Sequence, residues 1–248
     1  MSASSLTEAW SLDLAPATTS APFITLLSSA RLPAANFNTW LRNDYIYVHA
    51  GTHFLAHLIH SLPQTTKLHP LLIGGYFTLL SELSLFRSKA AARGVALPTL
   101  PAPHPDPGVE AARDPMAVLA VLTPTAAEGC AAYMRFLMEL CVGGAHWTTL
   151  LAVLSVCERV YLDAMVAVRE SEAFKSGTLD ESVRDFVEWW SSKEFSEYVG
   201  VLEAEAAAVR GGEGWREDEA RAAVEKAIAL EIGFWAIATE GLEGSEGQ

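Results

Sequence analysis

Three short motifs along the chain combine side chains that could do chemistry with aromatic neighbours. They are Asn43-Asp44-Tyr45-Ile46-Tyr47, Cys157-Glu158-Arg159-Val160-Tyr161 and Glu231-Ile232-Gly233-Phe234-Trp235. A thiol can act as a nucleophile, and a carboxylic acid in an apolar setting can move protons near neutral pH. A carboxylate, a thiol and a second carboxylate, brought together in a helical bundle, would support covalent catalysis on a small flat ring.

Asp44 lies on an apolar stripe of its predicted helix. The helical period of about 100° per residue puts Val48, Gly51 and Leu55 near the same side. Burying a carboxylate costs free energy unless it is hydrogen-bonded or has a function. Asp44 is therefore either a ligand-binding group or a structural one that caps a helix or pairs with an arginine.

Cys157 and Tyr161 are four residues apart, so they share one helix face. A thiol there is a nucleophile if its pKa is lowered or a base is near, but a free cysteine in a helix is more often a small core residue. Glu231 has mostly apolar neighbours and stands three residues before Phe234. It is either a buried proton donor and acceptor or an exposed residue of an amphipathic helix.

Two further groups stand out by spacing. His49, His53, His57 and His60 form one stripe, about 140° to 220° around the helix from Asp44. We expect this stripe to be a subunit interface or a solvated face, and we expect no metal site, because the obvious carboxylate partner is missing. Glu82 is either buried and paired or on a polar edge with Ser81 and Arg87; the polar edge is slightly favoured.

Composition excludes several classes of protein. The 248 residues are 50% hydrophobic with a formal charge of −13, which argues against nucleic acid or an anionic membrane as the main partner. No run of 18 apolar residues and no signal peptide is present, so we expect no membrane span. The three cysteines have no framework spacing. We therefore expect a cytoplasmic protein with reduced thiols and no cofactor.

The elements that must position these groups are all predicted to be helical. Ala, Leu and Glu dominate, and strict apolar/polar alternation is missing. Helices are predicted over residues 22–29, 34–62 (with a possible break near Gly51), 70–93, 125–141, 147–171, 178–209 and 217–239, with Pro70 at a helix start and Gly94 past a helix end. This predicts an all-α, single-domain bundle of about seven helices.

The remaining segments are predicted to lie outside the bundle. Residues 1–19 are predicted to be a loose N-terminal arm, residues 20–240 the helical domain, and residues 241–248 a disordered tail. Residues 94–115 contain six prolines and are predicted to be a loop, because proline is excluded from helix interiors. A surface connection is the favoured interpretation of this loop, and a lid over a site is the alternative.

In order and spacing, the motifs resemble those of the TenA family, the thiamin-pyrimidine salvage enzymes of the haem-oxygenase-like fold. The resemblance runs from about Phe23 to Ala238 and is carried by five short stretches and by Glu82. They are Phe37-Asn38-Thr39-Trp40-Leu41 leading into Asp44, Glu82, Thr123-Pro124 through Tyr133, Cys157 with Tyr161, Phe186 to Phe195, and Glu231 with Phe234 and Trp235.

The resemblance implies a function and a site. It implies hydrolysis of 4-amino-5-aminomethyl-2-methylpyrimidine to the hydroxymethyl form, with thiaminase II activity as a related cleavage. Cys157 would be the nucleophile and Glu231 the proton shuttle. Substrate-binding residues would be Asp44, Tyr47, Glu82, Tyr133, Tyr161, Trp190 and Phe234. The small-molecule substrate would be the main partner, and a homo-oligomer, dimer or tetramer, is expected.

Some positions depart from the family pattern. Phe86 stands where the family often has histidine, Trp190 where it has a pocket tyrosine, and Val156 where proline commonly precedes the cysteine. Trp190 and Phe86 would make the pocket bulkier and drier. An altered-substrate or non-catalytic member of the family is therefore one alternative. A metal-dependent oxidase of the same fold is another, if the histidine stripe faces the interior beside a carboxylate.

Overall fold

Every regular element in the part of the chain that the structure describes, residues 5–111 and 113–242, is helical. This computed structural model contains α-helices α1 to α12 and two 3-10 turns there, η1 and η2. Seven of the α-helices (α3, α4, α7, α8, α10, α11 and α12) have ten residues or more. The predicted all-α class is therefore confirmed. The total exceeds the predicted seven because short helices occupy the connections.

The chain forms two compact units: residues 1–36 with 151–248, and residues 37–150. In the second unit, the 37–150 unit, the elements are α3 (Ala34–Ser61, whose first residues belong to the other unit), α4 (Leu68–Ala92), α5 (Pro107–Glu110), α6 (Pro115–Leu122), η2 (Thr123–Thr125) and α7 (Glu128–Val142). None of the helices in the described residues is long and apolar enough to cross a membrane.

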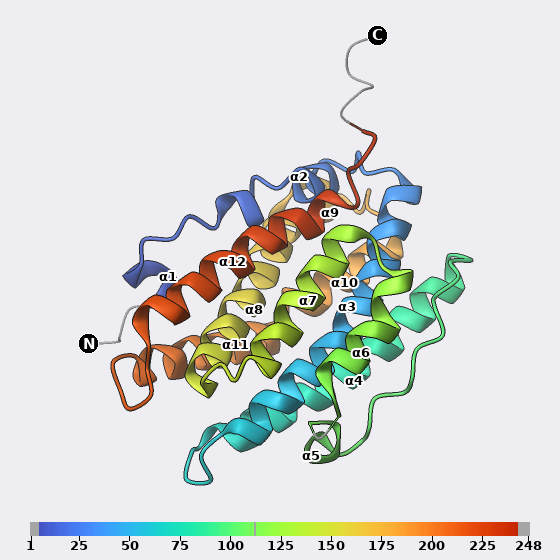
Figure 1. Cartoon of the computed structure of the whole chain (residues 1–248). Helices are drawn as coiled ribbons and strands as arrows, with labels where there is room; N and C mark the ends of the chain where they lie inside the picture. Colours follow the sequence, from blue (N-terminus) through green and yellow to red (C-terminus); the bar gives the residue numbers. More distant parts are fainter. Residues whose placement is uncertain (1–4, 112, 243–248) are drawn as a thin grey trace. The chain divides into compact units, whose positions relative to one another are not determined.

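Helices α3 and α4 pack antiparallel in the 37–150 unit (Figure 1). Near one end Nε of Arg93 donates to Oδ1 of Asn38 at 2.7 Å, and farther along Gly51 faces Leu79. The possible break near Gly51 does not occur, because α3 is continuous from Ala34 to Ser61. Gly94 ends α4 with a φ of +67°, as its predicted place past the helix end requires.

The proline-rich connection between α4 and α6 follows the histidine side of α3. The hydroxyl of Tyr76 donates to the carbonyl of His104 at 2.6 Å, and Nε2 of His49 lies 2.5 Å from the carbonyl oxygen of Pro101. Proline supplies no amide donor, so the segment is held through its carbonyls. Figure 1 shows this connection running to the short helix α5, a helical turn that the sequence did not predict.

The other unit contains α1 (Leu6–Ala9), η1 (Ala15–Ala17), α2 (Pro22–Ser28), α8 (Trp147–Glu170, whose first residues belong to the 37–150 unit), α9 (Glu172–Lys175), α10 (Glu181–Trp190), α11 (Lys193–Val209) and α12 (Glu217–Ala236). Trp235 of α12 lies in its core, stacked on Phe23 at 5.2 Å and 5.0 Å from the ring of Tyr161. Its indole nitrogen donates to the carbonyl of Ala17 at 2.9 Å.

Two predicted segments differ in the structure. The described part of the N-terminal arm, residues 5–19, is packed rather than loose, because Leu6, Trp10 and Ala17 are buried. Residues 243–248 of the predicted tail lie outside the described residues. The predicted helix 178–209 is two helices, α10 and α11. The hydroxyl of Ser192 accepts from the amide of Phe195 and starts a new helix there.

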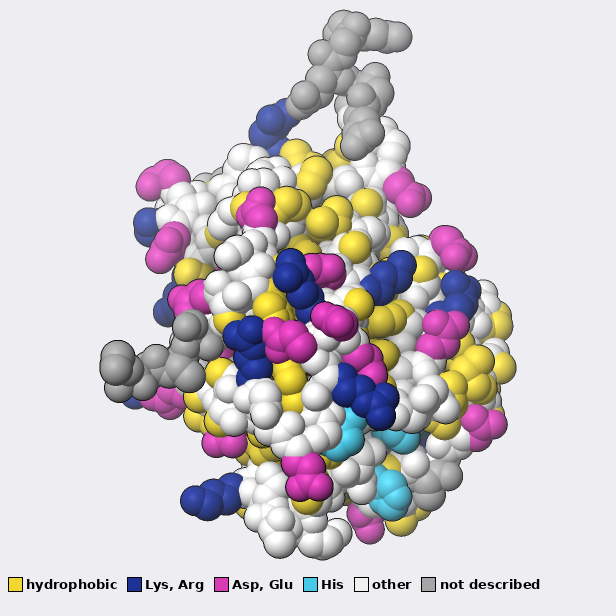
Figure 2. Space-filling view, turned by 60° about the vertical axis from the view of Figure 1, so that its left-hand side comes forward, with side chains coloured by type: hydrophobic (Ala, Val, Ile, Leu, Met, Phe, Trp, Pro, Cys, Tyr) yellow, Lys and Arg dark blue, Asp and Glu magenta, His cyan; other side chains and the backbone are white. Residues whose placement is uncertain are grey.

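Acidic and basic side chains are interspersed on the molecular face displayed in Figure 2. Among the described residues, several acidic and basic side chains form ion pairs within one helix or between neighbouring helices, for example Arg221 with Glu225 and Arg210 with Glu217. The chain has a formal charge of −13, but the acidic side chains on this face do not form one continuous acidic patch.

Candidate functional site

The candidate residues of the 37–150 unit lie on α3, α4 and α7. Asp44 is fully buried, as its place on the apolar stripe predicted. The rings of Tyr47 and Tyr133 lie 4.8 Å apart at 41°. Next to Asp44, Oδ1 of Asn43 accepts from the amide of Ala127 at 2.8 Å, which ties α3 to the start of α7. Asp44 is thus a buried carboxylate that directly follows Asn43, the residue that joins α3 to α7. It lies one helical turn before Tyr47.

A second thiol lies close to Asp44. Cys130 is fully buried, and its Sγ donates to the carbonyl of Asn43 at 3.4 Å. Burial, and to a smaller extent the charge of Asp44, raise the pKa of the Cys130 thiol. Cys130 is therefore a protonated core residue rather than a nucleophile.

Glu82 is buried, with 4% of its surface exposed, so the favoured polar edge is wrong. It shares one face of α4 with Leu83, Phe86 and Ala90, all buried, and this face points inward. Phe86 is fully buried, at 6.1 Å from the ring of Trp40. The position where the family often has a histidine is thus part of an aromatic core.

The candidate residues of the other unit lie on α8, α10 and α12. Cys157 is 9% exposed, and Tyr161, one turn further on, packs edge-on against Trp190 at 5.4 Å. Trp190 in turn stacks on Phe186, with ring centroids 5.3 Å apart and 13° between planes. The structure therefore brings Tyr161 and Trp190 together in an aromatic cluster one turn from the thiol.

Glu231 and Phe234 of α12 are each 1% exposed. The buried alternative for Glu231 is therefore the correct one. The buried face of α12 also includes Ala227, Ile228 and Trp235, so Glu231 is a carboxyl group within an otherwise apolar helix face. Such a group has to be hydrogen-bonded or functional to offset its desolvation.

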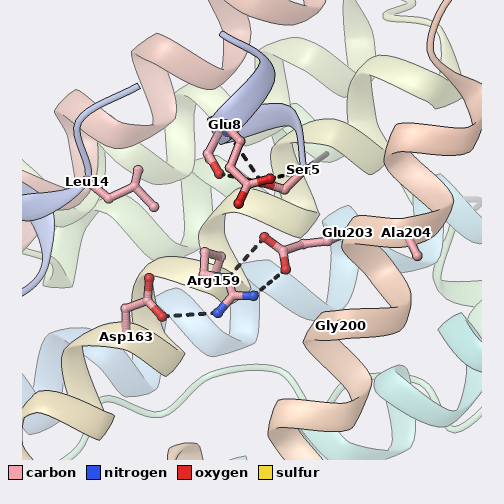
Figure 3. A pocket seen from close by; sticks show the side chains of 9 residues that line it. Ser5, Glu8, Leu14, Arg159, Asp163, Gly200, Glu203 and Ala204 are labelled. Atoms are coloured by element: carbon pink, nitrogen blue, oxygen red, sulfur yellow. Dashed lines mark hydrogen bonds and ion pairs between the residues drawn. The ribbon is translucent and has the colours of Figure 1, made fainter. Parts of the chain in front are cut away.

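Arg159, two residues after Cys157, takes part in a separate group of ion pairs. It forms ion pairs with Glu203 of α11 and with Asp163, 3.1 Å away (Figure 3). The hydrogen bond to Glu203, opposed by desolvation, is the main reason that the pKa of Arg159 is raised. These residues line a pocket with Ser5 and Glu8 of the N-terminal segment. Arg159 therefore joins α8 to α11 through its ion pair with Glu203.

The histidine stripe was expected to be a subunit interface or a solvated face. The solvated face is wrong. His49 and His53 are buried, His57 is half-buried, and only His60 is exposed. The proline-rich connection covers the first two, which is a tertiary contact that helical periodicity cannot predict. Among residues 5–111 and 113–242, no group of three or more His, Cys, Asp or Glu side chains is arranged to hold a metal ion.

Glu110 of α5 is a buried group that the sequence analysis missed. Its Oε1 lies 2.5 Å from Nδ1 of His53, and its Oε2 accepts from the amide of His104 at 2.7 Å. Burial by itself would raise the pKa of Glu110, but the bonds from His53 and His104, with the nearby Arg113, hold it below its usual value. Asp106-Pro107, a helix start, was the available signal.

Comparison with known proteins shows which class of fold this is. No family model matches the chain. It is 27% identical to an uncharacterized protein of Schizosaccharomyces pombe over 194 residues, 75% of this chain and 77% of the relative.

Solved structures give a closer description. A TenA homologue from Pyrococcus furiosus matches with a TM-score of 0.68 at 24% identity, covering 88% of this chain and 90% of that one. A protein of Silicibacter sp. TM1040, described as a TenA family transcription regulator, matches with a TM-score of 0.71 at 19% identity over 95% of both chains. The chain therefore has the fold of TenA homologues, as the resemblance predicted.

Proposed function

We propose that the protein hydrolyses an aminopyrimidine in thiamin salvage, converting 4-amino-5-aminomethyl-2-methylpyrimidine to its hydroxymethyl form, with thiaminase II cleavage as a related activity. The observation that carries the proposal is the pairing of Cys157 with Tyr161 on α8, in a chain with the fold of TenA homologues. The burial of Asp44 and Glu231, two carboxyl groups on apolar helix faces, supports it.

In the proposed reaction, Cys157 is the nucleophile. Its thiolate adds to the pyrimidine ring and breaks the aromaticity, and the electron pair gained by the ring expels the aminomethyl nitrogen as ammonia. Glu231 protonates the departing amine and then accepts a proton from the water that adds to the exocyclic carbon. Return of the electron pair expels the thiolate and restores the ring, so the cysteine is regenerated.

The remaining residues are proposed to bind the ring. Asp44 would accept from the ring amino group and from a ring nitrogen when that nitrogen is protonated, a role that a fixed, buried carboxylate performs without reorganisation. Tyr47 and Tyr133, already packed on one another, would provide one aromatic wall, and Tyr161 and Phe234 another. Glu82 would be a further polar contact to the substrate.

The test is release of ammonia from 4-amino-5-aminomethyl-2-methylpyrimidine by the wild type and by single variants. Cys157→Ala is expected to abolish turnover. Glu231→Gln is expected to lower kcat at least about a hundredfold, the contribution of a positioned acid or base. Asp44→Asn is expected to raise KM, because it removes an acceptor for the ring amino group.

Cys141→Ala is the matched control, since Cys141 is a buried thiol on α7 without an assigned role. It should retain wild-type turnover. Folding of each variant is checked by circular dichroism. Full activity of a folded Cys157→Ala protein would contradict the proposed chemistry.

A second candidate function is hydrolysis of a different small ring. It is favoured by Trp190, which is 3% exposed and fills the space beside Tyr161, where the family has a smaller tyrosine. If the wild type is inactive on the aminopyrimidine, Trp190→Tyr is the decisive variant. Gain of turnover would assign the altered specificity to this position, and continued inactivity would favour a binding role without catalysis.

A further inference from the structure

One stretch of the proline-rich connection has a conformation that its sequence restricts. In residues 97–104, every residue except Thr99 is a proline or directly precedes a proline. The proline ring holds φ at about −65°, and its bulk keeps the preceding residue out of the helical region. Both restrictions favour polyproline II, an extended left-handed helix with about three residues per turn. In the structure, residues 97–104 form neither α-helix nor strand.

The backbone of this stretch makes few hydrogen bonds. Two of its carbonyl groups, those of Pro101 and His104, accept from side chains of α3 and α4. Among residues 5–111 and 113–242, no hydrogen bond reaches the carbonyl oxygens of Pro98, Thr99 and Ala102. A polyproline II helix has no internal hydrogen bonds, and its backbone is solvated. These three oxygens are therefore open to a donor from another molecule.

The exposure of the side chains follows a period of three residues. Thr99 and Ala102 are both exposed and share one edge of a three-residue helix. Leu97 and Leu100 share a second edge, and both are half-buried. Pro101 belongs to the third edge and is exposed. The stretch thus has its leucine edge partly covered by the protein, while the neighbouring edges are accessible to a partner.

Contacts with the helices hold the stretch in place before any partner binds. The amide of His104 donates to Oε2 of Glu110 at 2.7 Å, and the carbonyl of His104 accepts from Tyr76 at 2.6 Å. Earlier in the stretch, the carbonyl of Pro101 accepts from Nε2 of His49. A segment that is already rigid loses little conformational entropy when it binds, so more of its contact energy appears as affinity.

We propose that residues 97–104 are a docking segment for a protein domain whose groove is lined by aromatic side chains. Such grooves recognise polyproline II segments with the spacing that Pro98 and Pro101 have here. Aromatic rings of the groove pack against the prolines, and a tyrosine hydroxyl or tryptophan indole donates to an open carbonyl. Apart from His104 the stretch has no titratable side chain, so shape and apolar contact carry the recognition. The proposal does not rest on the proposed function, because no residue assigned to pyrimidine chemistry lies in this stretch.

The test is binding of the intact protein to a representative set of isolated SH3, WW and EVH1 domains, which read polyproline II segments. Each immobilised domain is titrated with the wild type by biolayer interferometry, and we expect saturable binding to at least one of them. Pro98→Ala should weaken this binding about tenfold, because it removes one proline of the pair and leaves the Pro101 carbonyl on His49. Absence of saturable binding to every domain of the set would overturn the proposal.

Pro124→Ala is the matched control, since Pro124 is an exposed proline of η2 outside the stretch. It should bind like the wild type, and circular dichroism checks that both variants are folded. In ¹H–¹⁵N NMR spectra of the protein, the bound domain should shift the amides of Thr99, Leu100 and Ala102. Equal weakening by the two proline substitutions, or shifts confined to residues outside the stretch, would overturn the proposal, because the contact would then lie elsewhere.

Discussion

At the scale of single residues, the three cysteines show how surroundings decide reactivity. Cys130 is fully buried and donates to a backbone carbonyl, and Cys141 is 4% exposed. Burial raises the pKa of Cys141 to about 12. Cys157 retains 9% exposure next to Tyr161. The reactive form of a thiol is the thiolate, so the first two are poor nucleophiles at neutral pH.

We therefore predict selective alkylation. In the native protein at pH 7.5, iodoacetamide should modify Cys157 faster than Cys130 or Cys141, because raised pKa values keep those two protonated. Peptide mass spectrometry over a time course measures the order. In urea, where burial is lost, the three rates should converge. Early modification of Cys130 in the native protein would contradict the prediction.

At the scale of elements, the proline-rich connection is held by a few side chains. Tyr76 of α4 donates to His104, His49 of α3 donates to Pro101, and His53 meets Glu110 of α5. The described residues of the connection form no long helix or strand, so these contacts fix its position over α3. Such a segment is a local unit that can open separately from the helices.

Removing one of these contacts should loosen the connection. Tyr76→Phe deletes a 2.6 Å hydrogen bond and should cost about 1 kcal/mol of stability, the usual net value of one such bond. Limited proteolysis should cleave residues 94–106 faster than in the wild type. Ser81→Ala, an exposed change on the same helix, is the control and should leave cleavage unchanged. Equal cleavage of all three proteins would mean that Tyr76 does not hold the segment.

At the scale of the whole molecule, stability should depend on pH through buried histidine. Burial lowers the pKa of His49, with His53 and Arg87 acting in the same direction and Pro101 and Glu110 opposing. The unfolded chain then binds more protons below about pH 6.5, the ordinary histidine pKa. The stabilisation is thus complete above pH 6.5 and is lost as the pH falls toward the lowered pKa of the folded state.

Urea unfolding should therefore show a free energy that falls between pH 7 and pH 5.5. His49→Gln, which keeps a donor for the carbonyl of Pro101 but cannot titrate, should reduce this slope. His146→Gln, at a half-buried position just before α8, should leave it unchanged. If His49→Gln has the wild-type slope, another group carries the dependence.

We also propose that the protein forms a homo-oligomer. Several large apolar side chains are exposed in the 37–150 unit, including Phe77 at 50% and Val121 at 49%. Light scattering after size exclusion should give two or four times the chain mass of 26.7 kDa. Phe77→Glu should lower this mass, whereas Ser81→Glu on the same helix should not. A monomeric wild type at tens of micromolar would contradict the proposal.

Much of the fold was predictable because it depends on local pattern. The helix containing Asp44 was recognised from its period, and the end of α4 from Gly94, which adopts a left-handed φ of +67°. Burial of Asp44 followed from the apolar residues one and two turns further on. The break between α10 and α11 was missed because the signal, a serine cap at Ser192, looks like any other serine inside a polar helix.

Sequence by itself determined the helical class, the position of the long helices, and the order of Asp44, Cys157 and Glu231 along them. These features could be predicted because hydrophobic periodicity and the signals from glycine and proline act over only a few residues. Tertiary structure alone decided that His49 and His53 lie under the proline-rich connection and that Glu110 is buried beside His53. Those contacts join residues about 50 positions apart. They depend on how a proline-rich segment, which carries only the short helix α5, crosses a longer helix, and no local pattern records that.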